Sequence, residues 1–328
     1  MTPSLRATYC VAALLAVSGL FACKPGSKAV RVAGEETAGE AGASDRLSEA
    51  GQAGETAAGG TSGGAGAGGT VQRGVISVTQ AHVKSEALMI DSANFDVSAV
   101  FATYAELTRE QAAATVTTSG DCTATVLVID PKAPRVQPSP GLNAGTITVT
   151  GIGVPPTAVL EYTPGAPVGP SNYTGVRADT RFYEDGDVLT VRGAGGPDLP
   201  AFQAQSLTAP SEIAVTAPSC VTGSCPDVDH THDLLVAWEN GGAGKVSVLF
   251  ETVADAKVVL LQCKFDAQTG KGVVPTALLA KLDPVDGNTV SGIMQISPMN
   301  EVTFPVGDVS TTFSITSAQF EVLFNPLN

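Results

Sequence analysis

Two of the three histidines lie in a short run rich in carboxylates, which is the part of the chain best suited to hold a metal ion. In an extended segment His230 and His232 share a face. Neutral imidazole binds zinc or copper, and Asp227, Asp229 or Asp233 could supply a further ligand, with water in the open position. Calcium is less suited, because His232 stands at the sixth place of an EF-hand-like count from Asp227, where glycine is needed. The alternative interpretation is a solvated acidic loop that binds nothing.

A second group of carboxylates, Glu184, Asp185 and Asp187, surrounds Gly186 between two apolar runs. An Asp-Gly pair in this setting predicts a hairpin turn between residues 181–183 and 188–189. The same carboxylates are a further candidate for calcium, although the polar tip of a hairpin explains them equally well.

Aromatic residues that could stack on a ligand are few. Tyr162 precedes a stretch rich in Pro and Gly, residues 164–175, and Tyr173 lies near its end. These two tyrosines are the best candidates for exposed aromatic side chains. The sequence contains no zinc-peptidase motif and no phosphate-binding loop. A Ser-His-Asp triad needs no adjacency in sequence, so it stays open, but we assign no catalytic residue.

The N-terminus carries an export signal. Arg6 precedes an apolar stretch from Ala7 to Ala22, which has the length of a secretory signal and is shorter than the roughly 20 residues of a membrane-spanning helix. The stretch ends in Leu20-Phe21-Ala22-Cys23. This ending resembles the lipobox of bacterial lipoproteins, with Phe21 where the family has a smaller residue. An ordinary signal peptide that ends near a cysteine is the alternative.

The resemblance implies that residues 1–22 are removed as a signal peptide and that Cys23 is lipidated, so that the mature chain is tethered to a membrane through its lipid. Lys24 follows the cysteine, where the family's inner-membrane retention signal is Asp. The resemblance therefore implies the outer membrane or the cell surface.

A linker follows the predicted anchor and extends to residue 70. From Ala33 to Thr70 the chain has 12 Gly and 10 Ala, a single Leu and no aromatic residue. Such a composition cannot build a core, so we expect a disordered linker over residues 23–70. A flexible chain of this length reaches roughly 35 Å.

Cysteine usage agrees with export. Of the six cysteines, Cys10 lies in the predicted signal peptide and Cys23 is the predicted anchor, which leaves Cys122, Cys220, Cys225 and Cys263. In an oxidising compartment we expect two disulfides, for which three connectivities are possible. We favour Cys220 with Cys225 across a short turn, and Cys122 with Cys263.

The chain after the linker reads as short strands. Alternation is clearest in Phe95, Val97, Ala99 and Phe101, as expected of a strand with one buried face. Only two short helices are predicted, one from Thr108 through Ala112 to Ala114 and one capped by Thr276 and running to Leu282. The other predicted strands are 75–78, 122–129, 146–150, 158–162, 188–191, 213–216, 234–238, 246–250, 258–265, 290–296, 313–315 and 320–324. This spacing predicts an all-β fold.

We expect two β-sandwich-like domains, residues 71–209 and 210–328, because Ala209-Pro210-Ser211 interrupts the strand pattern. The second resembles an immunoglobulin or fibronectin type III module in its strands Ile213-Thr216, Asp233-Trp238 and Lys245-Val248. No Tyr follows Tyr183, so the tyrosine corner common in that superfamily is missing. Trp238, the single Trp, is expected in the core.

Charge and composition limit the function. With 18 basic and 32 acidic residues the chain has a formal net charge of −14, which disfavours nucleic acid as a partner. We predict a surface-tethered, noncatalytic lipoprotein that needs no cofactor and binds an unidentified protein or envelope partner, or has an adhesive or structural role. The alternative is an exported metal-binding protein or metal-dependent hydrolase that uses His230 and His232.

Overall fold

A computed structural model of the chain confirms an all-β fold. The residues that the structure describes are 70–85, 90–105, 112–129, 141–151, 157–164, 172–173, 175–219, 228–229, 231–254, 257–282, 292–318 and 320–324.

The described strands form three sheets. The ten-stranded sheet has the order β3 (Ala112–Ser119), β4 (Cys122–Ile129), β13 (Lys257–Asp266), β12 (Lys245–Ala254), β15 (Gly292–Val306), β16 (Val309–Ala318), β1 (Thr70–Ser85), β2 (Ile90–Ala105), β7 (Val176–Ala178), with β17 (Phe320–Phe324) also paired to β15. The four-stranded sheet has the order β6 (Thr157–Leu160), β5 (Ile147–Thr150), β8 (Val188–Gly193), β9 (Phe202–Thr208). The three-stranded sheet has the order β10 (Ala214–Ala217), β11 (Leu234–Glu239), β14 (Lys271–Val274).

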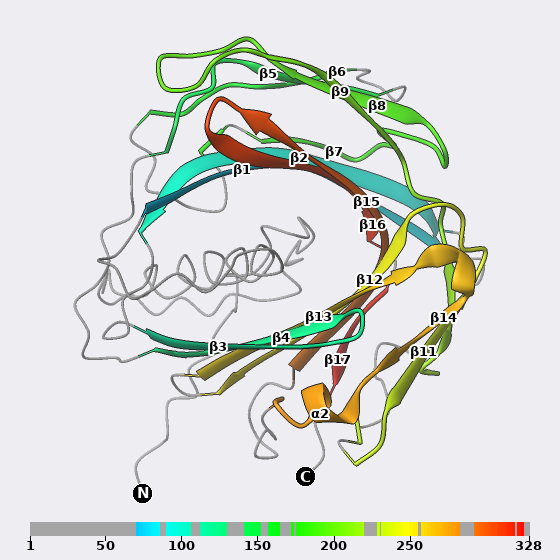
Figure 1. The fold of residues 1–328 in the computed structure, drawn as a ribbon. Helices are drawn as coiled ribbons and strands as arrows, with labels where there is room; N and C mark the ends of the chain where they lie inside the picture. The colour runs from blue at the N-terminus through cyan, green and yellow to red at the C-terminus, as the bar shows by residue number, and fades with distance from the viewer. Residues whose placement is uncertain are drawn as a thin grey trace, which may run out of the picture.

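The long strand β15 joins the two arms of the ten-stranded sheet. Residues 293–299 pair with β12 on one edge, and residues 292–296 pair with β17 on the other. Residues 299–306 then pair with β16, which pairs in parallel with β1. Figure 1 shows the result, a strongly curved sheet with β1 and β2 in one arm and β3, β4 and β13 in the other.

Each arm is covered on its outer face by one of the smaller sheets (Figure 1). Met294 and Ile296 of β15 belong to the core beneath the three-stranded sheet, and Phe304 and Val306 belong to the core beneath the four-stranded sheet. Alternate residues of a strand share a face, so one face of the large sheet carries both cores.

The core beneath the four-stranded sheet contains the alternating residues predicted for β2. Phe95, Val97, Ala99 and Phe101 are all buried there, which confirms the predicted face. The ring of Phe95 stacks on that of Phe182, with centroids 4.7 Å apart. Phe202 of β9 also packs against Phe304 of β15, with ring centroids 5.5 Å apart, so aromatic packing joins the four-stranded sheet to the large sheet.

The core beneath the three-stranded sheet contains Trp238, as expected. Its side chain is buried, its indole N–H donates to the carbonyl of Ala267 at 2.8 Å, and its ring stacks with Phe265. Leu278 and Leu279 of the short helix α2 (Thr276–Leu279) close this core.

The sheets do not separate at residue 209. β4, which precedes this residue, pairs with β13, which follows it. β1, which also precedes it, pairs with β16, which follows it. Each core contains residues from both sides of this position. The division into domains 71–209 and 210–328 stays a prediction, as does the immunoglobulin-like resemblance. β10 and β11, which correspond to the first two strands of the immunoglobulin-like resemblance, pair with each other. β12, which corresponds to its third strand, lies in the ten-stranded sheet.

The helix predicted from Thr108 is wrong over Ala112 to Ala114, because these alanines begin β3. Pairing with β4 along the whole strand outweighs the helix propensity of alanine. The second predicted helix is present as α2, which ends at Leu279 and is therefore shorter than expected. Among the described residues, none of the helices has the length and apolar character needed to cross a membrane.

Candidate functional site

Two of the predicted metal ligands, Asp229 and His232, lie together in an exposed turn before β11. One carboxylate oxygen of Asp229 accepts hydrogen bonds from the N–H of Thr231 at 2.7 Å and from its hydroxyl at 2.6 Å. The other oxygen lies 2.8 Å from Nδ1 of His232, which is also 2.8 Å from the Thr231 hydroxyl. The hydroxyl and the N–H of Thr231, together with His232, lower the pKa of Asp229 to about 2.

The third described candidate, Asp233, is used elsewhere. Its Oδ1 accepts a hydrogen bond from the N–H of Thr276 at 2.8 Å at the start of α2, so Asp233 provides the cap that the sequence assigned to Thr276. Asp227 and His230 lie outside the described residues. Within the described part of the chain, no three His, Cys, Asp or Glu side chains are grouped closely enough to hold a metal. The described geometry is therefore a carboxylate–imidazole pair.

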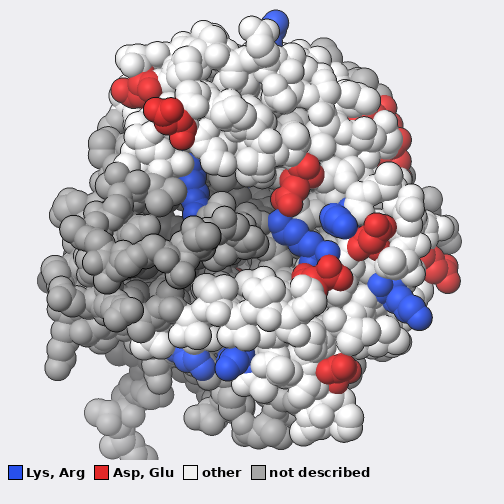
Figure 2. Space-filling view, viewed as in Figure 1, with Lys and Arg blue, Asp and Glu red and all other residues white. Residues whose placement is uncertain are grey.

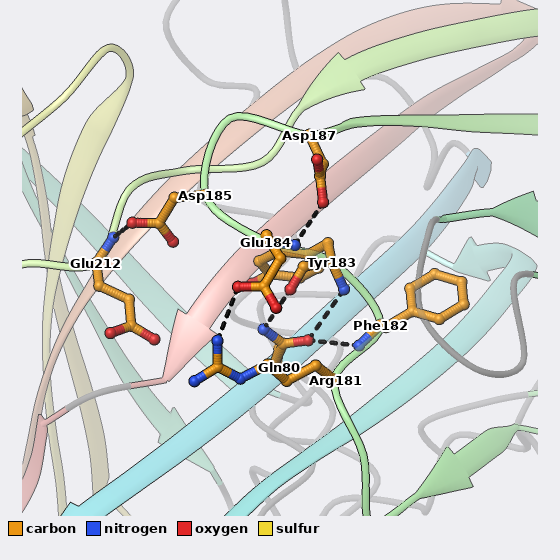
Figure 3. A network of polar contacts seen from close by, with 8 residues as sticks. All are labelled: Gln80, Arg181, Phe182, Tyr183, Glu184, Asp185, Asp187 and Glu212. Atoms are coloured by element: carbon orange, nitrogen blue, oxygen red, sulfur yellow. Dashed lines mark hydrogen bonds and ion pairs between the residues drawn. The ribbon is translucent and has the colours of Figure 1, made fainter.

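The acidic group around Gly186 is built into the backbone of a turn (Figure 3). Asp187 accepts a hydrogen bond from the N–H of Glu184, and Asp185 accepts one from the N–H of Glu212 at 2.9 Å. Gly186 has a φ of +80°, which favours glycine. The turn is confirmed, but residues 181–183 form no strand, so the predicted hairpin is wrong. Asp187 therefore closes the turn and Asp185 links it to the segment before β10, whereas the Glu184 carboxylate pairs with the Arg181 guanidinium at 2.7 Å.

Sequence reasoning missed a buried polar network beside that turn, which Figure 3 also shows. Oε1 of Gln80 accepts hydrogen bonds from the N–H groups of Phe182 at 2.7 Å and Tyr183 at 3.2 Å, and Nε2 donates to the Tyr183 carbonyl at 3.0 Å. The Tyr183 hydroxyl donates to the carbonyl of Thr316, and burial raises the pKa of this phenol. The sequence did contain a sign that Gln80 is buried. In the alternation of β1, Gln80 shares the inward face of Ile76 and Val78.

The expectation of an exposed aromatic side chain is wrong for Tyr173. Tyr173 is buried, and its hydroxyl accepts a hydrogen bond from the N–H of Ala144 at 2.7 Å. Burial raises the pKa of Tyr173 to about 12. Tyr162 is partly buried against the same core, and its hydroxyl donates to the carbonyl of Gly141 at 3.0 Å. Both tyrosines therefore act in packing.

Cys122 and Cys263 form a disulfide, in agreement with the pairing favoured from the sequence. They lie directly opposite one another on β4 and β13, and both are buried. The bond therefore joins segments from the two sides of residue 209. Cys220, Cys225 and Cys23 lie outside the described residues, so their disulfide and the lipidation stay predictions.

One buried carboxyl group has no assigned role. Glu251 of β12 is 5% exposed, and its Oε1 has no hydrogen-bond partner among the described residues. Its neighbours in register are Leu260 and Ile293, and burial raises its pKa to about 7. No nucleophile or second acid is present at these paired positions.

Charges on the described surface are mixed in sign. Figure 2 shows acidic and basic side chains interspersed over one face of the molecule. Two cross-strand ion pairs add to this pattern, Arg177 with Asp96 at 3.1 Å and Lys264 with Glu301 at 3.0 Å. Comparison with models of known protein families and with curated proteins finds no match to this chain.

Proposed function

We propose that this chain is a lipid-anchored, noncatalytic surface protein that presents a β-rich head for binding a partner or for supporting the cell envelope. Cys23 carries the lipid, the residues between it and β1 form the tether, and the head begins with β1 at Thr70. The proposed location is the outer membrane or the cell surface, because Lys24 follows the anchor.

The disulfide between Cys122 and Cys263 is the observation that carries this proposal. Disulfides of this kind persist in oxidising compartments and are rare in the cytosol. The bond therefore supports export of the chain. Export is also what the apolar leader that ends in Cys23 predicts.

The described polar side chains support a noncatalytic role. Asp185, Asp187 and Asp233 accept hydrogen bonds from backbone N–H groups, and Gln80 is held inside the core. The pair formed by Asp229 and His232 is exposed, with 80% of the histidine side chain accessible, so it lacks the dry surroundings in which acid–base groups are most effective.

Processing of the full chain in a bacterial host tests the proposal. Globomycin, which blocks the lipoprotein signal peptidase, and a Cys23→Ser change should each leave the leader uncut, and the serine variant should incorporate no radiolabelled palmitate. A Cys10→Ser change inside the leader is the matched control and should mature normally. Normal maturation of the Cys23→Ser chain would contradict the proposal.

A further inference from the structure

We propose that β3 is a dimer interface, where it pairs antiparallel with β3 of a second copy of this chain. β3 is the outermost strand of one arm of the ten-stranded sheet (Figure 1). Among the described strands only β4 pairs with it, on one edge.

β3 lacks the protection found at the other described edges. Natural edge strands are usually short, charged or covered. β7 has three residues and carries the ion-paired Arg177, β14 carries Lys271 and β17 carries Glu321. β9 is interrupted by a register shift against β8 between Phe202 and Gln205, and the carbonyl of its last residue, Thr208, accepts a hydrogen bond from the Asn300 side chain at 2.8 Å. β6 and β10 have four residues each. β3 has eight residues, with no charge and no proline, in unbroken register with β4.

The hairpin geometry fixes which backbone groups of β3 face the open edge. β3 and β4 are joined by the two-residue turn Gly120-Asp121, with Gly120 at φ +58° and Ser119 opposite Cys122. In a two-residue hairpin the closing pair is hydrogen-bonded, and bonded pairs then alternate along the strands. Thr117 and Thr115 therefore bond to β4, whereas Val116, Thr118 and Ala114 direct their N–H and C=O groups outward.

A two-fold axis at Val116 makes this edge complementary to itself. Val116 then lies opposite Val116 of the second copy, and Ala114 lies opposite Thr118. The three bonded pairs exchange about six hydrogen bonds. Val116 is 43% exposed in the single chain, so this pairing would cover an apolar side chain.

The absence of charge makes this edge the least repulsive place for a second copy. Two copies, each with a formal net charge of −14, repel one another overall. β3 has no charged residue, and Asp121 lies in the turn, beyond the residues that pair. Pairing at β3 therefore places no like charges opposite each other, which would be unfavourable in a sheet.

Cysteine cross-linking in the full chain tests the proposed register. Val116→Cys should give a disulfide-linked dimer on a non-reducing gel, with mass spectrometry locating the bond between the two introduced thiols at position 116. Thr118→Cys is the matched control and should give no disulfide-linked dimer, because the two copies of residue 118 would lie roughly 13 Å apart, beyond disulfide reach. The absence of a disulfide-linked dimer of Val116→Cys would overturn the proposal. Linkage of the introduced thiol to another segment or to another protein would overturn it too, because a different occupant would hold the edge.

Sedimentation of the full chain in detergent gives an independent test. The unaltered chain should sediment as a dimer. Val116→Pro should convert it to a monomer with little change in melting temperature, because the lost N–H points outward, whereas Thr117→Pro should lower the melting temperature by breaking pairing with β4. Val116→Lys, which places like charges opposite each other, should also give a monomer if the proline variant does not fold. A wild-type monomer at every concentration would contradict the proposal.

Discussion

Replacing Cys122 and Cys263 together by alanine should lower the free energy of unfolding of the chain by about 3 to 5 kcal/mol. The two residues are 141 apart in sequence. In the chain-entropy model, closing a loop of that length removes about 17 cal/mol/K from the unfolded chain, which is about 5 kcal/mol at 25 °C. Both cysteines are buried, so alanine leaves small voids and no unpaired polar group.

The matched control is the double change Cys220→Ala and Cys225→Ala. If these two residues are paired, their short loop is worth only about 2 kcal/mol in the same model. Urea unfolding of the full chain, followed through the fluorescence of the single, buried Trp238, measures both losses. An unchanged free energy of unfolding in the first variant, or equal losses in the two, would refute the loop-closure reasoning.

Three further predictions concern single side chains. Gln80→Leu should lower the free energy of unfolding by about 3 kcal/mol, because three buried backbone groups of Phe182 and Tyr183 lose their hydrogen-bond partner. The control Gln72→Leu, at an exposed position, should change the free energy of unfolding by less than about 0.5 kcal/mol. Similar losses for the two variants in urea unfolding would contradict the role of Gln80. Glu251 has its pKa raised from 4.5 to about 7 in the folded chain, so the folded state binds the proton more tightly and stability should fall as pH rises through that window. Glu251→Gln should flatten this dependence in melting curves recorded between pH 4.5 and 8, and an equal slope in the variant would show that the carboxyl group is not its source. Thr231→Val should raise the pKa of Asp229 from about 2 toward the usual 3.8, as measured by carbon NMR of the carboxyl group, and an unchanged value would remove Thr231 as the main cause.

Strands bounded by local signals could be predicted from the sequence. β4 and β17 begin and end at the predicted residues, because each is rich in apolar and β-branched side chains. The buried face of β2 followed from strict alternation.

Strands that depend on distant partners could not be predicted in this way. The second half of β15 contains Asn300, Glu301 and Pro305, which are uncommon in strands, and pairing with β16 holds it extended. β9 has no clear alternation and owes its place to β8. The arrangement of the two cores likewise follows from β15 crossing between the arms, and short-range patterns do not encode that crossing.

The candidate site shows the same division. Asp229 and His232 are close in sequence, so their contact could be anticipated, whereas the hydrogen bond from Thr276 to Asp233 requires β11 and α2 to be neighbours. The pairing of Cys122 with Cys263 was accessible because few cysteines leave few connectivities.

The mass of the N-terminal peptide of the chain, isolated from bacterial membranes, tests the lipid-anchored account most directly. The account predicts that the mature chain begins at Cys23 and carries the mass of a diacylglycerol thioether with a further acyl chain. An unmodified N-terminus, or an intact leader still attached to residue 23, would contradict it.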